Sequence, residues 1–174
     1  SHSDGGRQGL RIALPGDFIG YAPAGETHTT HGVVAITDSI LCGFRQADLH
    51  AMLDTHPGLA SHITRIQTRY MASCQSAMLG LGRKSAEQRI AYLIAPLYYR
   101  LKNRQQLPAD TSSMPFPITQ EMLGDCTGLT PVHTNRVMRK LRSDGVIEVH
   151  RQLLTIHDLD RLVEVGEFTA TDVE

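Results

Sequence analysis

Apolar side chains recur at helical spacing in residues 116–147 and predict two short helices joined by a tight turn. The first helix has Met122 and Leu123 on its inner face. The second helix carries a longer apolar stripe, which consists of Val137, Met138 and Leu141. Each helix is therefore expected to turn one face to a core and the other to solvent.

Local signals define the ends of both helices. Thr119 is a suitable N-cap for the first helix, and Gly128 ends it because glycine adopts the left-handed conformation at low cost. Thr130 caps the second helix, and Pro131 takes the first helical position, where its missing N–H is not needed. These signals place the turn at residues 128–130.

The outer face of the second helix is predicted to be basic. Residues 129–143 contain four Lys/Arg residues and no acidic residue. The polar positions away from the stripe are His133, Asn135, Arg136, Arg139, Lys140 and Arg142. A helix, a glycine-containing turn and a second helix with a basic face are typical of a helix-turn-helix that enters the DNA major groove.

The residues after this motif predict a β-hairpin and a last helix. Gly145 ends the second helix, and two extended segments, 146–149 and 153–156, flank a turn near residues 151–152. The hairpin would be the wing of a winged helix. Asp158 is a candidate cap for the last helix.

The first 44 residues alternate between apolar and polar positions in short segments. These segments predict strands at 10–14, 18–19, 33–36 and 40–44, separated by turn signals such as Pro15-Gly16-Asp17. The strands are too few to close a barrel or sandwich, so this end is expected to be truncated or completed by a partner. A short helix follows at 46–55, with Leu49, Met52 and Leu53 expected inward.

A long helix is predicted to begin at Pro57 and to end near residue 80. Its apolar positions are spaced 3, 4, 4, 3 and 4 residues apart, close to a heptad pattern. They are Ile63, Ile66, Tyr70, Cys74, Ala77 and Leu81. The pattern favours a dimer seam, and a helix packed against its own domain remains the alternative. Gly80 and Gly82 predict a break that serves as a hinge.

A further helix is predicted after this hinge. Ser85 and Gln88 form a capping-box pattern at its start, and Pro96 is expected to kink it or to remove one hydrogen bond. Its apolar positions are Ile90, Leu93, Ile94, Leu97 and Leu101. Residues 108–115 are interpreted as a polar connector.

Composition narrows the class of protein. The 41% apolar content permits a core, and no run approaches the ~18 apolar residues of a membrane span. Three separated cysteines argue against a disulfide framework, so a reducing compartment, the cytoplasm, is expected. The net charge of -1 conceals an asymmetry, because residues 57–106 hold eight Lys/Arg against one acidic residue while both ends are acidic.

Other kinds of chemistry are not expected. The histidines follow no spacing typical of a zinc site and are interpreted as surface residues: His28, His31, His50, His56 and His62. Cys74 is interpreted as a small apolar residue rather than a redox thiol. The sequence contains no P-loop, dinucleotide fingerprint or G-x-S-x-G motif, so neither an enzyme nor a metal protein is predicted.

The order of these parts resembles the Crp/Fnr superfamily of bacterial transcription regulators. The motifs that carry the resemblance are PGDFIG at 15–20 and the 118–147 block, with Gly124, Gly128, Leu129, Thr130, Arg136, Leu141 and Gly145. The resemblance implies an α+β fold in three parts. These are a partial antiparallel β-roll of the cyclic-nucleotide-binding type with a short helix (3–56), a dimerisation helix and hinge (57–82), and a winged helix-turn-helix (83–174).

The resemblance also implies a function and its partners. A homodimer would bind a two-fold symmetric operator in double-stranded DNA, with one recognition helix, residues 130–143, from each subunit. RNA polymerase is a further candidate partner. The dimer interface would follow Ile63, Ile66, Tyr70, Cys74 and Ala77.

The resemblance assigns roles along the recognition helix. Its base-reading positions are here Pro131, Val132 and Arg136, with Asn135 as an additional candidate. Arg136 is expected to contact a guanine edge through two hydrogen bonds, whereas Val132 can contact only a thymine methyl group. The candidate phosphate contacts are Thr119, Thr130, His133, Arg139, Lys140 and Arg151.

The sensor end departs from the cyclic-nucleotide-binding members, which place Glu after the PGDxxG turn and an Arg-Ser/Thr-Ala further on. Here Tyr21 follows Gly20, and no arginine lies between Arg11 and Arg45. Cyclic AMP is therefore not expected to bind. The cysteine cluster of the iron–sulfur members is not found, so no cofactor is predicted and the effector is unidentified. The alternative function is a winged-helix protein-interaction module that does not bind DNA.

Overall fold

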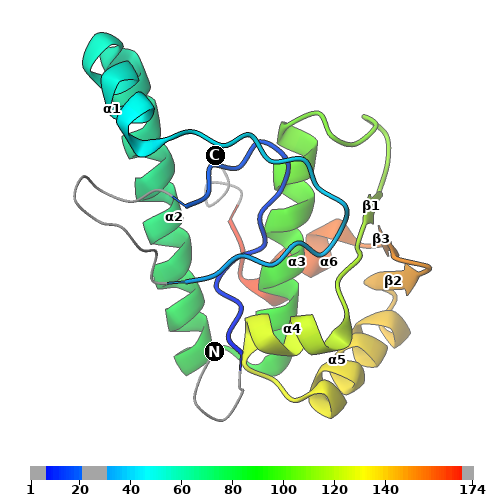
Figure 1. Ribbon diagram of the computed structural model, residues 1–174. Coiled ribbons are helices and arrows are strands. Elements are labelled where there is room, and N and C mark those ends of the chain that lie inside the picture. The colour runs from blue at the N-terminus through cyan, green and yellow to red at the C-terminus, as the bar shows by residue number, and fades with distance from the viewer. Residues whose placement is uncertain (1–6, 21–30, 170–174) are drawn as a thin grey trace. The chain divides into compact units, whose positions relative to one another are not determined.

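The computed structural model describes residues 7–20 and 31–169 (Figure 1). Tyr21 and His28 lie outside the described residues. The helices and strands follow one another as α1 Gln46–Thr55, α2 Pro57–Arg83, α3 Ala86–Asn103, β1 Ser113–Pro115, α4 Gln120–Thr127, α5 Pro131–Ser143, β2 Ile147–His150, β3 Leu153–Ile156 and α6 Leu159–Gly166. The mixture of helices with a small antiparallel sheet confirms the expected α+β class.

The chain divides into two compact units. One unit is Ala13–Cys74, and the other combines Ser1–Ile12 with Gln75–Glu174. The long helix α2 contributes residues to both. The winged helix-turn-helix lies entirely within the second unit.

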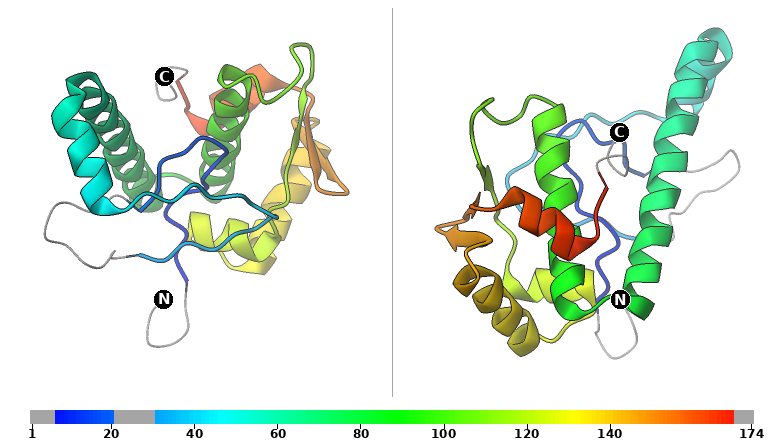
Figure 2. Two further views of the ribbon diagram at one scale, coloured as in Figure 1. Left: turned by 45° about the horizontal axis from the view of Figure 1, so that its top comes forward. Right: turned by 180° about the vertical axis from the view of Figure 1, so that it is seen from behind.

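Helix α3 is the centre of the second unit. It begins with the predicted capping box, in which the Gln88 amide donates to Ser85 Oγ at 3.2 Å and the Ser85 amide donates to Gln88 Oε1 at 2.7 Å. Ile90 and Ile94 are fully buried. Pro96 lies inside the helix without ending it. Helices α4, α5 and α6 all pack against α3, and Figure 2 shows α6 lying across it.

The sheet closes the core beside these helices. Its strand order is β1-β3-β2, with both pairs antiparallel, so the predicted hairpin is β2 and β3. Met114 of β1 is opposite Leu154 of β3, and both side chains are buried. Residues 108–115 were predicted to be a connector, but the last three of them, Ser113–Pro115, form a third strand of the sheet. Three residues are too short for alternation to reveal a strand.

A lysine fastens the start of α3 to the end of α6. Lys84 Nζ donates to the Gly166 carbonyl oxygen at 2.6 Å and lies 4.2 Å from the centroid of the Tyr92 ring. A Cβ on Gly166 would lie 3.0 Å from the Tyr92 backbone nitrogen, so the two helices approach too closely there for a side chain. The α2–α3 junction is thereby held to the last helix of the unit.

The predicted strands of the β-roll are not formed. Residues 7–20 and 31–44 contain no strand, although the turn at Pro15-Gly16 is present and the Asp17 amide donates to the Leu14 carbonyl at 3.0 Å. Val33 and Val34 are 60% and 63% exposed, and Ile40 is 97% exposed. A strand needs a neighbouring strand that pairs with it in a ladder of hydrogen bonds, and no such ladder includes the described residues 7–20 or 31–44. The strands expected at 10–14, 18–19, 33–36 and 40–44 are therefore corrected to irregular chain, and α1 follows the second of these described segments.

Two expectations for the helices of the first 83 residues were also wrong. Helix α1 buries none of its residues, and Met52, which we expected to point inward, is 41% exposed. Helix α2 does not break at Gly80 and Gly82 but continues to Arg83, and the Lys84 amide donates to the Gly80 carbonyl at 2.9 Å. A glycine inside a helix costs only about 0.5–1 kcal/mol relative to alanine, which a continuous hydrogen-bonded helix tolerates.

Candidate nucleic-acid interface

The turn between α4 and α5 has the predicted caps. Thr119 Oγ1 accepts from the Met122 amide at 3.2 Å, and Thr130 Oγ1 accepts from the His133 amide at 3.3 Å. Gly128 ends α4 in the left-handed conformation at φ 66°, and Pro131 begins α5. One backbone amide in the first turn of each helix is therefore satisfied by its threonine cap, and Gly128 and Pro131 fix where α4 ends and α5 begins.

The inner face of α5 is anchored in the core. Leu141 is fully buried and Val137 is nearly so, while Met138 is half-buried. Thr134 is also fully buried, although the pattern of apolar positions did not include it. The predicted stripe is therefore correct, with one threonine added. This anchoring fixes which residues of α5 face solvent.

The outer face of α5 carries the predicted base-reading positions. Val132 is 82% exposed, and Pro131, Arg136 and Arg139 are exposed beside it. Among the residues that the structure describes, neither Arg136 nor Arg139 has an ion-pair partner. Two guanidinium groups without an ion-pair partner among the described residues therefore lie on the same outer face of α5 as the exposed Val132.

Lys140 and Arg142 are already paired with acids. Lys140 Nζ lies 2.6 Å from Asp144 Oδ2 and 3.0 Å from Glu87 Oε1, while Arg142 lies 3.0 Å from Glu148. The hydrogen bond to Asp144, followed in size of effect by the hydrogen bond to Glu87, raises the pKa of Lys140 above its usual value. Its charge is thus matched within the described chain, and Lys140 is a weaker candidate for a phosphate contact than Arg139.

The structure gives Asn135 a partner, Gln120, which the sequence did not single out. Asn135 Nδ2 donates to Gln120 Oε1 at 2.8 Å, which joins the first turn of α4 to the middle of α5. Gln120 is exposed and Asn135 is half-buried. The two residues are 15 positions apart, a separation at which neither helical periodicity nor a capping rule predicts a contact.

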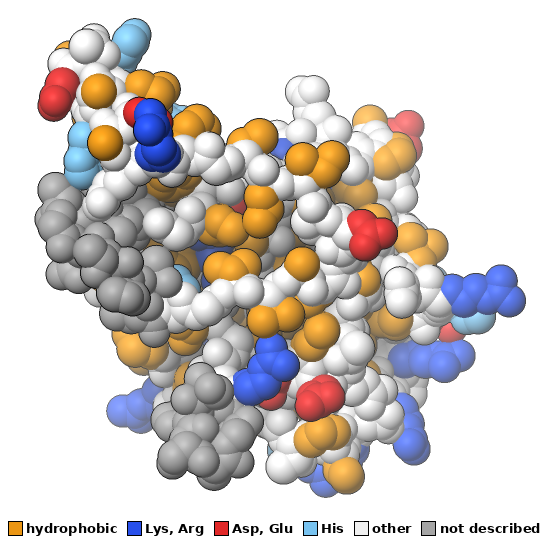
Figure 3. All heavy atoms as spheres, in the orientation of Figure 1, with side chains coloured by type: hydrophobic (Ala, Val, Ile, Leu, Met, Phe, Trp, Pro, Cys, Tyr) orange, Lys and Arg blue, Asp and Glu red, His pale blue; other side chains and the backbone are white. Residues whose placement is uncertain are grey.

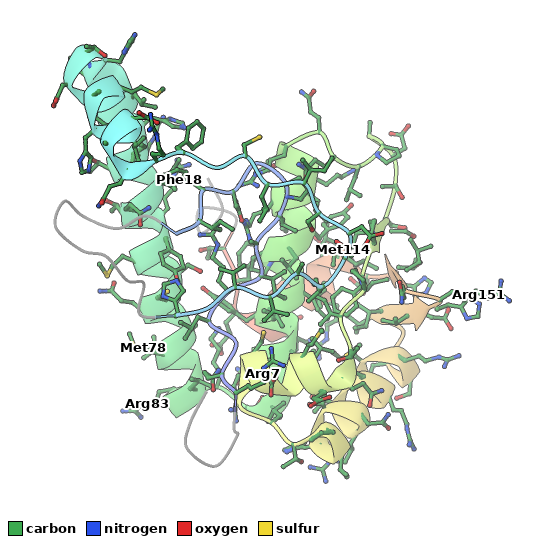
Figure 4. The ribbon with its side chains drawn as sticks, viewed as in Figure 1. Arg7, Phe18, Met78, Arg83, Met114 and Arg151 are labelled. Carbon is green, nitrogen blue, oxygen red and sulfur yellow. The ribbon has the colours of Figure 1, made fainter. Side chains whose placement is uncertain are left out.

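The hairpin brings one more arginine to the surface. Arg151 and Gln152 form its two-residue turn with φ values of 46° and 63°, the conformation that matches the twist of paired strands. Arg151 projects from the tip of the wing (Figure 4). Lys and Arg side chains gather where α5 and this hairpin lie (Figure 3). The candidate interface therefore combines α5 with the wing tip.

The predicted dimer residues of α2 differ in exposure. Ile63 is buried, Ala77 is exposed, and Ile66, Tyr70 and Cys74 are half-buried. The most exposed large apolar side chains within the heptad-like stretch include Met71 at 62% and Met78 at 64%, seven residues apart. Met78 is labelled in Figure 4.

In residues 7–20 and 31–169, no group of three or more His, Cys, Asp or Glu side chains is arranged to hold a metal ion. None of the described helices is both long enough and apolar enough to cross a bilayer.

Comparison with known proteins shows a matching domain family and similar transcription regulators. Residues 88–165 match the family described as the Crp-like helix-turn-helix domain. The transcriptional activator protein FnrL of Cereibacter sphaeroides is 32% identical over 165 residues, 92% of this chain and 65% of the relative. The nitrogen fixation regulation protein FixK of Bradyrhizobium diazoefficiens is 29% identical, over 84% of this chain and 60% of the relative. The chain thus spans less than two thirds of the length of these relatives.

Solved structures share the fold. FixK2 from Bradyrhizobium japonicum superposes with a TM-score of 0.56 at 21% identity, covering 69% of this chain and 58% of that one. A CooA variant from Carboxydothermus hydrogenoformans gives 0.55 at 15% identity, covering 69% and 54%. Residues 88–165, which hold the helix-turn-helix and the wing, are therefore similar to the Crp-like helix-turn-helix domain, and the chain as a whole is similar to transcription regulators such as FnrL and FixK.

Proposed function

We propose that the protein is a sequence-specific DNA-binding transcription regulator that acts in the cytoplasm as a homodimer. The observation that carries this proposal is the outer face of α5, where Val132, Arg136 and Arg139 are exposed on a helix anchored by Leu141. A helix held rigidly by its inner face can enter a major groove without reorganising, which lowers the cost of binding.

The proposed contacts divide by chemistry. Arg136 donates two hydrogen bonds to a guanine edge, Val132 contacts a thymine methyl group, and Pro131 lies against the base edges nearby. The N-terminus of α5 directs free backbone N–H groups and the positive end of its dipole at a phosphate. The side chains proposed to hold phosphates are Thr119, Thr130, His133, Arg139 and Arg151, with Lys140 in a lesser role because its charge is already paired.

The homodimer is proposed to form along α2, so that two copies of α5 lie about one DNA turn apart. The half-buried and exposed positions of the heptad-like pattern support this arrangement, since they offer apolar side chains at coiled-coil spacing. The proposed interface consists of Ile63, Ile66, Tyr70, Cys74 and Ala77, extended by Met71 and Met78. Sedimentation at increasing protein concentration tests it, and a monomer at every concentration would end the proposal.

Selection of bound DNA from a random pool tests the main proposal. We expect the selected sites to be two-fold symmetric, and we expect affinity to fall with salt with a log–log slope of roughly -0.9 for each phosphate neutralised. RNA polymerase would then be sought as a partner on the selected site. If no DNA is shifted at low salt, the alternative of a winged-helix protein-interaction module is favoured instead.

A further inference from the structure

The contact between Gln120 and Asn135 lies at the edge of the proposed reading surface. Asn135 Nδ2 donates to Gln120 Oε1 at 2.8 Å. On α5, Asn135 is three residues after Val132 and four before Arg139, so the three side chains share one side of the helix. Gln120 is the first residue of α4 and is exposed. An amide from each helix of the motif is therefore placed next to the exposed valine and arginine.

The hydrogen bond leaves Asn135 with the groups that an adenine edge requires. A primary amide has two N–H donors and one carbonyl acceptor, and the contact with Gln120 uses one donor. The acceptor Oδ1 and the second N–H remain. Adenine presents N6 as a donor and N7 as an acceptor in the major groove, and asparagine commonly pairs with both. Asn135 can therefore keep its bond to Gln120 and read an adenine at the same time.

The same hydrogen bond restricts the orientation of the Asn135 side chain. An exposed asparagine rotates among several conformers and loses that freedom when it binds a base. In this contact the Gln120 carbonyl oxygen accepts from the nitrogen end of Asn135, so the bond holds the Asn135 amide in one orientation as long as it is formed. Gln120 thus prepares Asn135 before DNA arrives.

We propose that Gln120 is a positioning residue for base recognition, which acts by holding Asn135 in the orientation that reads one adenine beside the guanine read by Arg136. This inference rests on the proposed DNA-binding function. It adds a specificity determinant on α4, outside the recognition helix. A purely structural tie between the helices, or a direct phosphate contact from Gln120, would produce different results in the following experiment.

The test is a double-mutant cycle read at every base pair of the selected site. Wild type, Gln120→Ala, Asn135→Ala and the double variant are measured against the site and against each single base-pair substitution. We expect Asn135→Ala to lose discrimination at one A·T pair by roughly 5- to 150-fold, the range of a good two-bond base contact. Gln120→Ala should lose part of that discrimination at the same pair, and should change nothing further when Asn135 is already alanine.

Two controls separate the inference from a loss of folding. Glu121→Ala changes the neighbouring exposed residue of α4 and should leave discrimination at that pair unchanged. Thermal unfolding of each variant shows whether the motif is intact. A uniform loss of affinity for all sequences in Gln120→Ala, an effect at a different base pair, or no effect at all would each overturn the inference. If wild-type protein selects no DNA, the proposed function fails first and the inference fails with it.

Discussion

A Cβ atom on Gly124 would lie 2.5 Å from the carbonyl oxygen of Leu129. Gly124 lies inside α4 and Leu129 lies in the turn that follows it, and the Leu129 amide donates to the Gly124 carbonyl at 3.1 Å. The obstacle is backbone rather than a side chain, so it cannot move aside without changing the turn. The angle at which α5 leaves α4 therefore depends on the missing side chain of Gly124.

Gly124→Ala is expected to lower the free energy of unfolding by about 1–3 kcal/mol, the usual cost of overpacking a rigid site. Chemical denaturation followed by circular dichroism measures it. Gly82→Ala is the matched control, because a Cβ at Gly82 would meet nothing within 4 Å. That change should instead stabilise α2 by about 0.5–1 kcal/mol. Equal effects at the two glycines would show that the turn relaxes freely.

Thr134→Val is expected to stabilise the protein. The Thr134 side chain is fully buried, and its Oγ1 has no hydrogen-bond partner in the described part of the chain. Valine has the same shape without the hydroxyl, so the substitution removes a desolvation penalty of about 1–3 kcal/mol without opening a cavity. The measurement is the midpoint of urea unfolding.

Thr127→Val provides the comparison for this prediction. Thr127 is also buried, but its Oγ1 donates to the Leu123 carbonyl oxygen at 2.6 Å. Here the hydroxyl contributes a hydrogen bond, so its removal should destabilise by about 0.5–1.5 kcal/mol. A destabilising effect of Thr134→Val would mean that its hydroxyl finds a partner, such as an ordered water, in solution.

The sequence was informative where the physical cause is local. Thr119, Gly128 and Thr130 define helix ends through contacts with residues three or four positions away, and all three lie where the pattern placed them. The bond between Asn135 and Gln120 joins different helices, so no local pattern specifies it. The same holds for the Glu87 partner of Lys140, which comes from α3.

The predicted strands and the predicted break in α2, which the structure does not contain in the described residues, also have physical explanations. The alternation around Val33 and Ile40 is a real strand signal, but alternation describes a preference that is realised only when a neighbouring strand supplies hydrogen bonds. The glycines of α2 were interpreted as a break because each lowers helix propensity. Propensity is a weak term beside the backbone hydrogen bonds of a continuous 27-residue helix.

Cys126 is expected to react slowly with alkylating reagents at neutral pH. Burial, together with the charge of Asp125, raises the pKa of its thiol above the ordinary value. The Gly9 amide donates to the Asp125 carbonyl at 2.9 Å, and Gly9 packs directly against the Cys126 sulfur. Labelling with iodoacetamide and mass spectrometry of the peptides should therefore show Cys42, which is exposed, modified first.

The raised pKa of Cys126 also determines how the stability of the folded state depends on pH. The neutral thiol is favoured in the folded state, so its contribution to stability is present below the unfolded pKa of about 8.5 and is lost as pH rises through the folded pKa. Alkylation of Cys126 should accelerate over that alkaline range, and in denaturant the two cysteines should react alike. Equal rates in the native protein at pH 7 would contradict the burial of this thiol.

Arg136 and Arg139 are expected to have different roles: Arg136 reads a base and Arg139 contacts a phosphate. Both are exposed, and neither has an ion-pair partner among the described residues, so each charge is available to DNA. Arg136→Ala should cost about 1–3 kcal/mol on the preferred site and flatten discrimination at one base pair, because a two-bond contact with guanine is lost. Binding isotherms on the selected site and its single substitutions measure this.

Arg139→Glu should weaken binding to all sequences alike and reduce the steepness of the salt dependence, since a phosphate contact carries no sequence information. Arg83→Glu is the matched charge reversal, because Arg83 is also exposed but ends α2 rather than lying on α5. It should change affinity much less. A uniform loss from Arg136→Ala would make Arg136 a phosphate contact, and an effect of Arg139→Glu confined to one base pair would make Arg139 the reader. Either result would change the role of that one arginine while leaving α5 as the DNA-binding helix.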